Sequence, residues 1–237
     1  MTDERFSRTA MLLGEEAVDR LWSSRVMLFG LGGVGGYACE ALARAGIGEL
    51  ILVDFDTVSC SNINRQILAD DTTIGQPKAA VAAARVLRIS PQARVQTVEQ
   101  FVDEANAASL IQAAAPHYII DAIDHVPGKL AIIQTAHARG IPVISCMGTG
   151  NKLYPEKLQI SDISKTHTCP LARSVRAKLR AAGISHVEVL WSSEQPRTPR
   201  IPLVEDGRAV PATVSFVPAA AGLLLGGHVI RRLANIQ

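Results

Sequence analysis

The chain has 237 residues, of which 48% are hydrophobic and 19% are charged. This composition excludes an intrinsically disordered chain, and the length fits one large domain. The 24 Lys and Arg residues against 22 Asp and Glu residues give a net charge of +2, which excludes a generally polyanion-binding protein of the histone type.

The first 150 residues predict strands that alternate with helices. Short apolar or alternating runs predict strands at 26–29, 50–53, 94–98, 118–120 and 142–146. Helical spacing of apolar residues follows the first strand as far as Arg44 and recurs at 78–89 and 129–139. This rhythm is typical of a parallel sheet covered on both faces, so we expect a Rossmann-like, doubly wound α/β fold with a mostly parallel sheet.

After Gly150 the pattern changes. Residues 158–163 alternate like an antiparallel strand, 171–182 form a basic helical pattern, and 187–191 are again strand-like. The sequence therefore predicts antiparallel strands added to the sheet in the second half of the chain.

The end of the chain predicts a crossover followed by a core element. Residues 194–211 contain four prolines and predict an extended, mobile crossover. The apolar stretch 214–230 is 17 residues long and is interrupted by Pro218, so a strand running into a buried helix explains it better than a membrane span does. We expect a single domain over 1–237, with a nucleotide-binding core in 1–150 and a substrate-side elaboration in 151–237.

The polar N-terminus and the cysteine spacing argue against export and zinc. Residues 1–8 lack the apolar core of a secretory signal, which favours a cytoplasmic protein without a membrane partner. The four cysteines contain no C-x-x-C pair, so we expect neither a zinc site nor a disulfide framework.

A glycine-rich turn predicts phosphate binding. Residues 30–35 fit G-x-G-x-x-G directly after a predicted strand and at the start of a predicted helix, where backbone and helix terminus can approach a phosphate. Glycines in such a turn can also serve packing alone. Asp54 follows Gly35 by 19 residues at the end of the next strand, where a carboxylate can accept from ribose hydroxyls. NAD and ATP fit these features equally well.

The segment from Asp54 to Lys78 favours ATP over NAD. It places Asn62, Arg65 and Lys78 beside the glycine turn, and a triphosphate gains most from converging cations. Taken singly, Lys78 could be a surface charge and Asn62 a helix cap. Asp124 could be a solvated carboxylate at a strand end, and Asp121 is ambiguous between a structural cap and a site residue.

Together these motifs resemble the ubiquitin-activating-enzyme-like (ThiF) superfamily over residues 5 to about 150. The resemblance rests on the glycine turn, D-x-D at 54–56, N-x-x-R-Q at 62–66, a later Lys and a later Asp. It implies that Asp124 binds magnesium near the reacting phosphate of ATP. The implied nucleotide-binding residues are Gly30, Gly32, Gly33, Gly35, Asp54, Asp56, Asn62, Arg65, Gln66 and Lys78.

The segment Arg5-Phe6-Ser7-Arg8 is similar to the family's N-terminal R-Y-x-R segment. There the second arginine reaches the phosphates of the neighbouring subunit and stabilises charge during transfer. The resemblance therefore implies a homodimer and a catalytic group of Arg8, Arg65, Lys78 and Asp124. The alternative for Arg8 is a disordered surface arginine.

The second half points to one branch of the superfamily. Activators of sulfur carriers commonly have two C-x-x-C pairs, which are absent here, whereas 164–172 and 189–196 resemble segments of tRNA threonylcarbamoyladenosine dehydratases. This resemblance implies ATP-dependent cyclisation of N6-threonylcarbamoyladenosine in tRNA and, by family analogy, a cysteine desulfurase and sulfur-acceptor system as a partner. The alternatives are adenylation of the C-terminal glycine of a ubiquitin-like sulfur carrier, a non-catalytic nucleotide-dependent module and, last, a dehydrogenase.

Charge placement independently favours an RNA substrate. Residues 165–200 contain seven Lys or Arg (165, 173, 176, 178, 180, 197 and 200) against two acids (188 and 194). Three of the arginines fall at i, i+3 and i+7 and are expected on one helical face that follows a phosphate backbone; a merely solvated face is the alternative. The candidate substrate-side residues are Lys165, His167, Cys169, Arg173, Arg176 and Arg180.

Two of these substrate-side candidates have alternatives of their own. Cys169 precedes Pro170 at a predicted helix start, and it could act as an acyl-accepting nucleophile or as a helix cap. His167 could orient the substrate or be structural.

Overall fold

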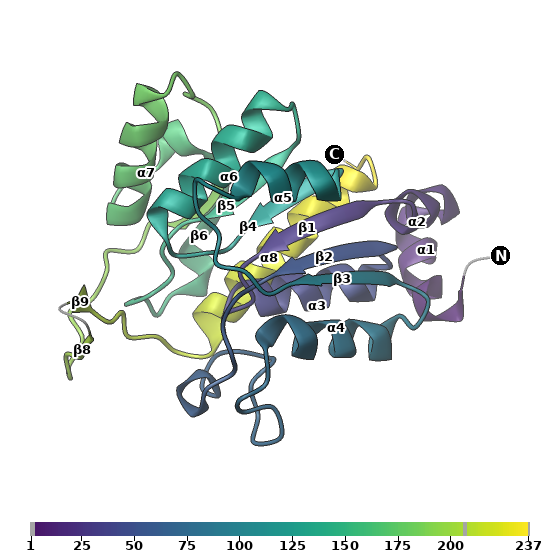
Figure 1. The fold of residues 1–237 in the computed structure, drawn as a ribbon, viewed down its shortest axis with the longest axis horizontal. Helices are drawn as coiled ribbons and strands as arrows, with labels where there is room; N and C mark the ends of the chain where they lie inside the picture. Colours follow the sequence, from purple (N-terminus) through teal and green to yellow (C-terminus); the bar gives the residue numbers. More distant parts are fainter. Residues whose placement is uncertain (1–2, 206–207, 237) are drawn as a thin grey trace.

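A seven-stranded sheet organises the computed structural model, which describes residues 3–205 and 208–236 (Figure 1). The strand order is β3-β2-β1-β4-β5-β7-β6, and within this sheet every neighbouring pair is parallel except β7 with β6. The strands are β1 Arg25–Phe29, β2 Glu49–Val53, β3 Arg94–Val98, β4 Tyr118–Asp121, β5 Val143–Cys146, β6 Leu158–Asp162 and β7 Glu188–Ser192. The predicted mostly parallel α/β sheet with an antiparallel addition in the second half is confirmed.

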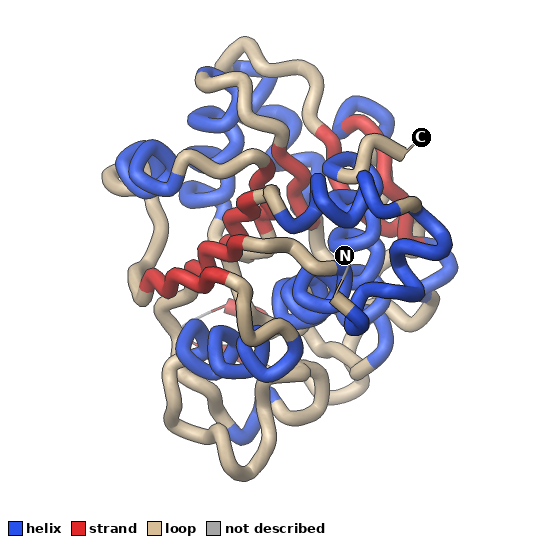
Figure 2. Tube along the Cα trace, turned by 90° about the vertical axis from the view of Figure 1, so that its right-hand side faces the viewer, coloured by secondary structure: helices blue, strands red, loops and turns tan. Residues whose placement is uncertain are grey.

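Helices cover both faces of this sheet, and Figure 2 shows the strands running between them. Helices α3, α4 and α8 share one core cluster, whereas α5, α6 and α7 pack in two clusters on the other face. The helices are α1 Ser7–Leu13, α2 Glu15–Trp22, α3 Gly35–Ala45, α4 Lys78–Ile89, α5 Ala107–Ala114, α6 Val126–Ala138, α7 Pro170–Ala181 and α8 Phe216–Leu233. The pattern analysis did not predict α1, α2 and α5.

The central strands are unbroken apolar runs in the sequence because both faces of the sheet are buried. In β1, Met27 and Phe29 pack toward α5 and α6, while Val26 and Leu28 pack toward α3, α4 and α8. All four side chains are fully buried. A central parallel strand such as β1 therefore has no polar face. The end of its apolar run marks the start of the glycine-rich turn.

Two predicted boundaries were wrong. Helix α6 begins at Val126 rather than Lys129, because the His125 ring Nδ1 accepts from the Gly128 N–H at 3.2 Å and caps the helix earlier. Residues 214–230 contain no strand, and α8 begins at Phe216. Its buried residues Val217, Ala221 and Leu225 recur every four positions, which is helical spacing.

Helix α8 lies close against α3 because glycine removes the side chain at their contact. A Cβ on Gly222 would stand 2.2 Å from the Val34 carbonyl oxygen. In the described part of the chain, no helix has the length and apolarity to cross a bilayer. The predicted crossover contains only the short antiparallel strands β8 Val204–Glu205 and β9 Arg208–Ala209 as described regular structure, and its mobility stays a prediction.

Candidate nucleotide-binding site

The candidate site lies where the strand order reverses, between β1 and β4. A cavity of about 540 Å³ opens at the carboxyl ends of β1, β2 and β4. Ligands of open α/β sheets bind at such a switch point because the two connections leave in opposite directions and open a crevice. Nearly all predicted nucleotide residues line this cavity: Gly30, Gly32, Gly33, Asp54, Asp56, Asn62, Arg65, Gln66, Lys78 and Asp124.

The glycine turn has its shape because two positions admit no side chain. Gly30 has φ +85°, and a Cβ there would stand 2.8 Å from the Ala122 carbonyl oxygen. A Cβ on Gly35 would stand 1.7 Å from the Gly30 carbonyl oxygen. Gly35 is not among the lining residues, and its close approach to Gly30 gives it a packing role, while its contact with the nucleotide stays a prediction. Gly32, Gly33 and Val34 present the start of α3 to the cavity.

Asp54 fixes this turn to the end of β2. One carboxylate oxygen accepts from the Leu31 N–H at 2.6 Å and the other from the Asp56 N–H at 2.9 Å. Burial raises the pKa of Asp54, and these two N–H donors and the nearby Lys78 partly oppose that rise. The carboxylate therefore holds the backbone of two loops at the cavity edge where the sequence predicts a ribose.

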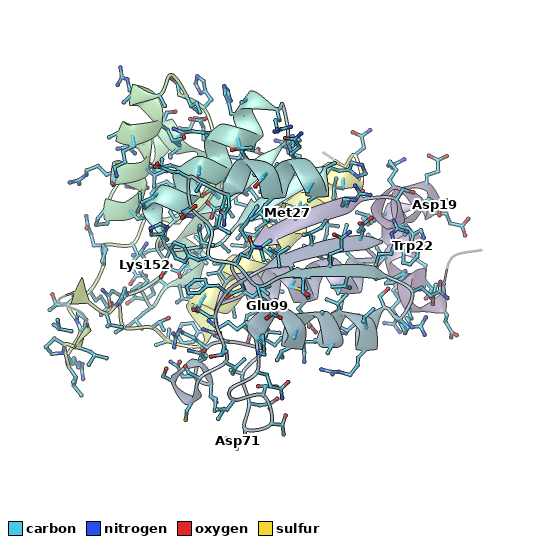
Figure 3. The ribbon with its side chains drawn as sticks, in the orientation of Figure 1. Asp19, Trp22, Met27, Asp71, Glu99 and Lys152 are labelled. Carbon is cyan, nitrogen blue, oxygen red and sulfur yellow. The ribbon has the colours of Figure 1, made fainter. Side chains whose placement is uncertain are left out.

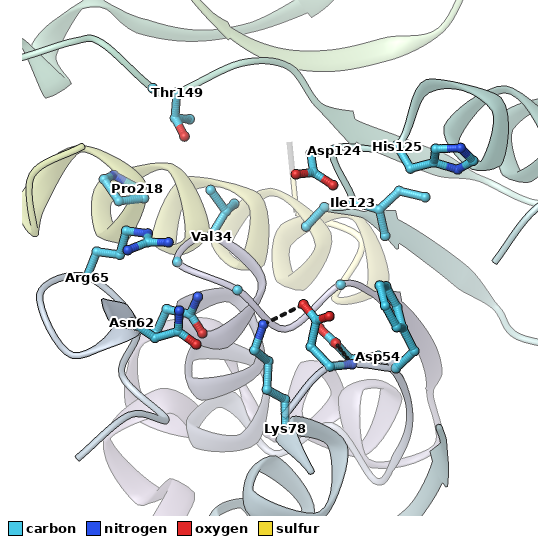
Figure 4. Close-up of a pocket in the computed structure, with 18 of the residues that line it drawn as sticks. Val34, Asp54, Asn62, Arg65, Lys78, Ile123, Asp124, His125, Thr149 and Pro218 are labelled. Carbon is cyan, nitrogen blue, oxygen red and sulfur yellow. Dashed lines mark hydrogen bonds and ion pairs between the residues drawn. The ribbon is translucent and has the colours of Figure 1, made fainter. Parts of the chain in front are cut away.

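The cations predicted for the phosphates come from the start of α4 and from the turn that contains Arg65 (Figure 4). The Lys78 ammonium is buried at the start of α4 and donates to the Asp56 carboxylate at 2.7 Å. The Arg65 guanidinium donates to the Ser61 carbonyl at 2.7 Å and to the Asn64 side-chain oxygen at 2.9 Å. Both charges lie on the cavity wall opposite Asp124.

Asn62 and Gln66 are buried amides on the same wall. The Asn62 side-chain oxygen accepts from the Ser59 N–H at 3.1 Å, so the capping role considered for Asn62 is present. The Gln66 side-chain oxygen is buried without a hydrogen-bond partner among the described residues. A buried unpaired amide oxygen is costly, which fits a group that completes its bonding with a ligand or water.

The Asp124 carboxylate lies in the cavity without a hydrogen-bond or ion-pair partner among the described residues. It is exposed, it projects into the cavity in Figure 4, and none of the described residues forms a hydrogen bond or ion pair with it. Its loop follows β4, and the Ile123 N–H donates to the Asp121 carboxylate at 3.2 Å. This hydrogen bond ties the residue before Asp124 to the end of β4.

The ambiguity over Asp121 is resolved in favour of structure. Asp121 and Lys129 are both fully buried and form an ion pair at 2.8 Å. The Ser145 hydroxyl donates to the same Asp121 oxygen at 2.5 Å, and Lys129 also donates to the Cys146 carbonyl at 3.0 Å. This network joins β4, β5 and α6 beneath the cavity. The sequence analysis missed Lys129, although a lysine inside an apolar helix is a signal for a buried pair.

An aromatic wall closes the end of the cavity near Asp54. The ring centroids of Phe55 and Phe101 are 4.9 Å apart, and those of Phe101 and His125 are 4.8 Å apart. All three line the cavity. Such a surface can pack against a purine. The sequence analysis did not single these residues out, because isolated aromatics after strands carry no spacing signal.

Arg8 lies far from this cavity. It is exposed on α1, at the end of the sheet opposite the cavity, and it is not a lining residue. Figure 3 shows the same separation, with Asp19 and Trp22 of the adjoining α2 at one end and Lys152 at the other. Arg8 therefore cannot act on a nucleotide in its own subunit.

Three of the predicted substrate-side residues, Lys165, His167 and Cys169, directly precede α7, and the three arginines lie along it. Cys169 is buried, and its sulfur accepts from the Ala172 N–H at 3.5 Å, which confirms the capping alternative. The His167 ring packs against Trp191 with centroids 4.5 Å apart. Lys165 is exposed.

The basic face of α7 is smaller than predicted. Arg173 and Arg180 are exposed, but Arg176 turns inward and donates to the Thr166 carbonyl at 2.9 Å and to the Thr166 hydroxyl. The expected exposed row of three arginines is therefore corrected to two. Arg176 therefore stabilises the turn before α7.

Among residues 3–205 and 208–236, no group of three or more His, Cys, Asp or Glu side chains could hold a metal ion. A divalent cation at Asp124 would have to take its other ligands from a bound nucleotide and water. Mg²⁺ commonly binds in this way, with one or two carboxylates and substrate phosphates.

Comparison with known proteins finds similarity over the whole chain. The model of the ThiF family matches residues 6–237. The tRNA threonylcarbamoyladenosine dehydratase of Bacillus subtilis is 40% identical over 240 residues, covering 97% of this chain and 94% of the relative. The molybdopterin-synthase adenylyltransferase of Escherichia coli is 38% identical over 143 residues, covering 60% of this chain and 57% of the relative.

Solved structures match the fold equally fully. The crystal structure of Escherichia coli tRNA N6-threonylcarbamoyladenosine dehydratase with AMP superposes with a TM-score of 0.89 at 34% identity, covering 98% of this chain and 94% of that one. The structure of the same enzyme with ATP gives a TM-score of 0.88. The adenylyltransferase similarity covers 60% of this chain, whereas the dehydratase similarity covers 97% of it.

Proposed function

The chain belongs to the ThiF family, and from that premise we propose that it is an ATP-dependent tRNA threonylcarbamoyladenosine dehydratase. The observation that carries the proposal is one cavity at the sheet's switch point. It unites a glycine turn, converging Lys78 and Arg65, and the free carboxylate of Asp124. The full-length similarity to dehydratases, which includes a structure with ATP, selects this member of the family.

The reaction begins with a carboxylate that is a poor electrophile. The threonyl carboxylate attacks a phosphate of ATP to form a mixed anhydride: attack on the α-phosphate releases pyrophosphate, and attack on the γ-phosphate releases ADP. The neighbouring carbamoyl group then attacks the activated carbonyl carbon and closes a ring, so that the activated oxygen departs with the phosphate and one water is lost overall. Ring closure within one nucleoside is favoured by proximity.

Each group of cavity residues has its own role in this reaction. Lys78 and Arg65 offset the phosphate charge, the glycine turn brings backbone and helix terminus to the phosphates, and Asp54 faces the ribose. We further propose that Asp124 holds Mg²⁺ together with the nucleotide phosphates, which its unpaired carboxylate supports. The ion would polarise the phosphate that is attacked.

Residues 1–150 form the nucleotide-binding core in this proposal, and 151–237 supply the substrate side. The tRNA phosphates bind to the exposed cations Lys165, Arg173 and Arg180. His167 lies beside them and orients the substrate. The use of a tRNA substrate supports a cytoplasmic location, which stays a proposal, and a cysteine desulfurase and sulfur-acceptor partner stays a prediction from the family resemblance.

Mass spectrometry of nucleosides tests the proposal directly. We expect tRNA that carries threonylcarbamoyladenosine to lose one water from that nucleoside after incubation with the protein, ATP and Mg²⁺. No loss in protein that binds ATP would contradict the dehydratase function. Release of pyrophosphate stimulated by a ubiquitin-like carrier, and not by tRNA, would favour carrier adenylation instead.

We also propose a homodimer in which Arg8 of one subunit serves the cavity of the other. The support is the location of Arg8, which excludes action on its own cavity. Arg8→Ala and Asp124→Asn are each expected to be inactive. When the two are coexpressed, each mixed dimer has one intact site out of two, so purified mixed dimers should show about half of the wild-type activity. Mixed dimers purified with two different tags give the measurement, and absence of recovery would contradict action between subunits.

A further inference from the structure

Asn151 connects two distant parts of the chain at the rim of the cavity. Its backbone N–H donates to the Ala212 carbonyl at 2.7 Å, and its side-chain oxygen accepts from the Ala212 N–H at 2.8 Å. Asn151 has φ +60°, a conformation that asparagine adopts more readily than most residues. The residue therefore satisfies both backbone groups of Ala212 at once.

This pair of bonds fixes a wall of the nucleotide cavity, which we define as residues 210–213. Val210, Pro211 and Thr213 line the cavity. Pro211 covers Gly150, where a Cβ would stand 2.6 Å from the proline Cβ. Residues 210–213 belong to the second half of the chain and cover one side of the cavity. Without them, that side would be open.

The same wall is attached to the phosphate-binding loop. The Asn64 side-chain nitrogen donates to the Thr213 carbonyl at 3.3 Å, and the Asn64 oxygen accepts from Arg65. Asn151 and Asn64 therefore hold the wall from opposite sides of the cavity. A shift of the wall would be transmitted to Arg65, which we place at the phosphates.

Residues 151–154 also anchor the beginning of the crossover. The Asn151 carbonyl accepts from the Arg197 N–H at 2.8 Å. The Glu194 carboxylate accepts from the Leu153 N–H at 3.0 Å and the Tyr154 N–H at 2.9 Å. Burial alone would raise the pKa of Glu194, but these bonds and Arg197 hold it below its ordinary value.

We propose that Asn151 is a positioning residue of the nucleotide site, whose side chain holds residues 210–213 as the wall of the ATP cavity. The proposal rests on the proposed function, since it takes ATP as the ligand. It assigns no chemical step to Asn151. Its specific claim is that the side-chain acceptor for the Ala212 N–H governs how tightly the nucleotide is held.

Three substitutions separate the effect of the side-chain hydrogen bond on nucleotide binding from the effect of the positive φ. Asn151→Gly keeps the positive φ and removes the acceptor, Asn151→Ala removes the acceptor and strains the backbone, and Asn151→Asp keeps an acceptor oxygen. Asn235→Ala is the matched control, because Asn235 has φ +58° and is exposed at the end of α8. Binding is measured by calorimetry with ATP and with uncharged adenosine, so that the charge added by Asn151→Asp does not obscure the result.

We expect Asn151→Gly and Asn151→Ala to raise the Kd and the KM for ATP about 5-fold to 10-fold, with kcat at saturating ATP changed less than about 2-fold. Amide exchange of the peptide that contains Ala212 should accelerate in both. Asn151→Asp should bind adenosine like the wild type, and Asn235→Ala should change nothing.

An unchanged Kd in Asn151→Gly, or no change in amide exchange at Ala212, overturns the proposal. Wild-type protein that binds ATP but does not dehydrate the tRNA nucleoside refutes only the dehydratase function, and the binding measurements still decide the role of Asn151. Wild-type protein that binds no ATP overturns both.

Discussion

Asp124→Asn is expected to lower the rate of nucleoside dehydration by about 10²-fold to 10³-fold, the loss typical of removing a group that stabilises charge in the transition state. The substitution keeps the size of the side chain and removes only its charge. Because no described residue forms a hydrogen bond or ion pair with the Asp124 carboxylate, the fold should lose nothing. Single-turnover mass spectrometry of the tRNA nucleosides, with saturating ATP and Mg²⁺, measures the rate.

Asp71→Asn is the matched control for this experiment. Asp71 is exposed in a loop that Figure 3 shows projecting away from the sheet, and its substitution removes the same charge. We expect Asp71→Asn to retain the wild-type rate, and both variants to retain the wild-type Tm. If Asp124→Asn dehydrates the nucleoside within about 3-fold of the wild-type rate, Asp124 is not a catalytic residue and the proposed magnesium position is wrong.

The strands could be predicted closely because their physical signal is local. A parallel strand buried on both faces is an unbroken apolar run, and β2, β4 and β5 begin and end within one residue of the prediction. Helix α6 was misplaced because its start depends on the His125 cap. The apolar stretch before α8 was misread because both a strand and a buried helix produce it.

The site could be predicted where single residues follow strand ends. The glycine turn, Asp54 and Asp124 each follow a strand, and parallel strands bring such residues to one edge of the sheet. Arg176 shows the limit of this reasoning. Helical spacing placed it correctly on α7, but the Ile163 and Thr166 carbonyl groups that accept from its side chain are brought there by the folded turn.

The wall at 210–213 shows a second limit. Pro211 is held at the cavity by the hydrogen bonds between Ala212 and Asn151, which are 61 residues apart in the chain. Neither residue belongs to a motif, and no periodicity connects them. Contacts of this kind depend on how the crossover returns over the sheet, so only the folded chain places them at the nucleotide site.

Lys129→Met is expected to cost the most stability of any change proposed for this protein, about 3–5 kcal/mol of the free energy of unfolding. It leaves the Asp121 carboxylate, which is fully buried, without its cation at 2.8 Å. Chemical denaturation followed by circular dichroism measures the loss. Lys178→Met is the control, because Lys178 is exposed on α7 and its substitution should change stability by less than about 0.5 kcal/mol.

The double variant Asp121→Asn with Lys129→Met tests the physical cause. An asparagine at position 121 can still accept from the Ile123 N–H through its oxygen and donate from its amide nitrogen to the Ser145 hydroxyl oxygen, and it leaves no buried charge. If the unpaired charge causes the loss, the double variant should be more stable than Lys129→Met alone, since replacing a whole buried pair is often neutral. Equal stability of the two variants would instead assign the loss to the packing of the lysine side chain, and the electrostatic account of this network would be wrong.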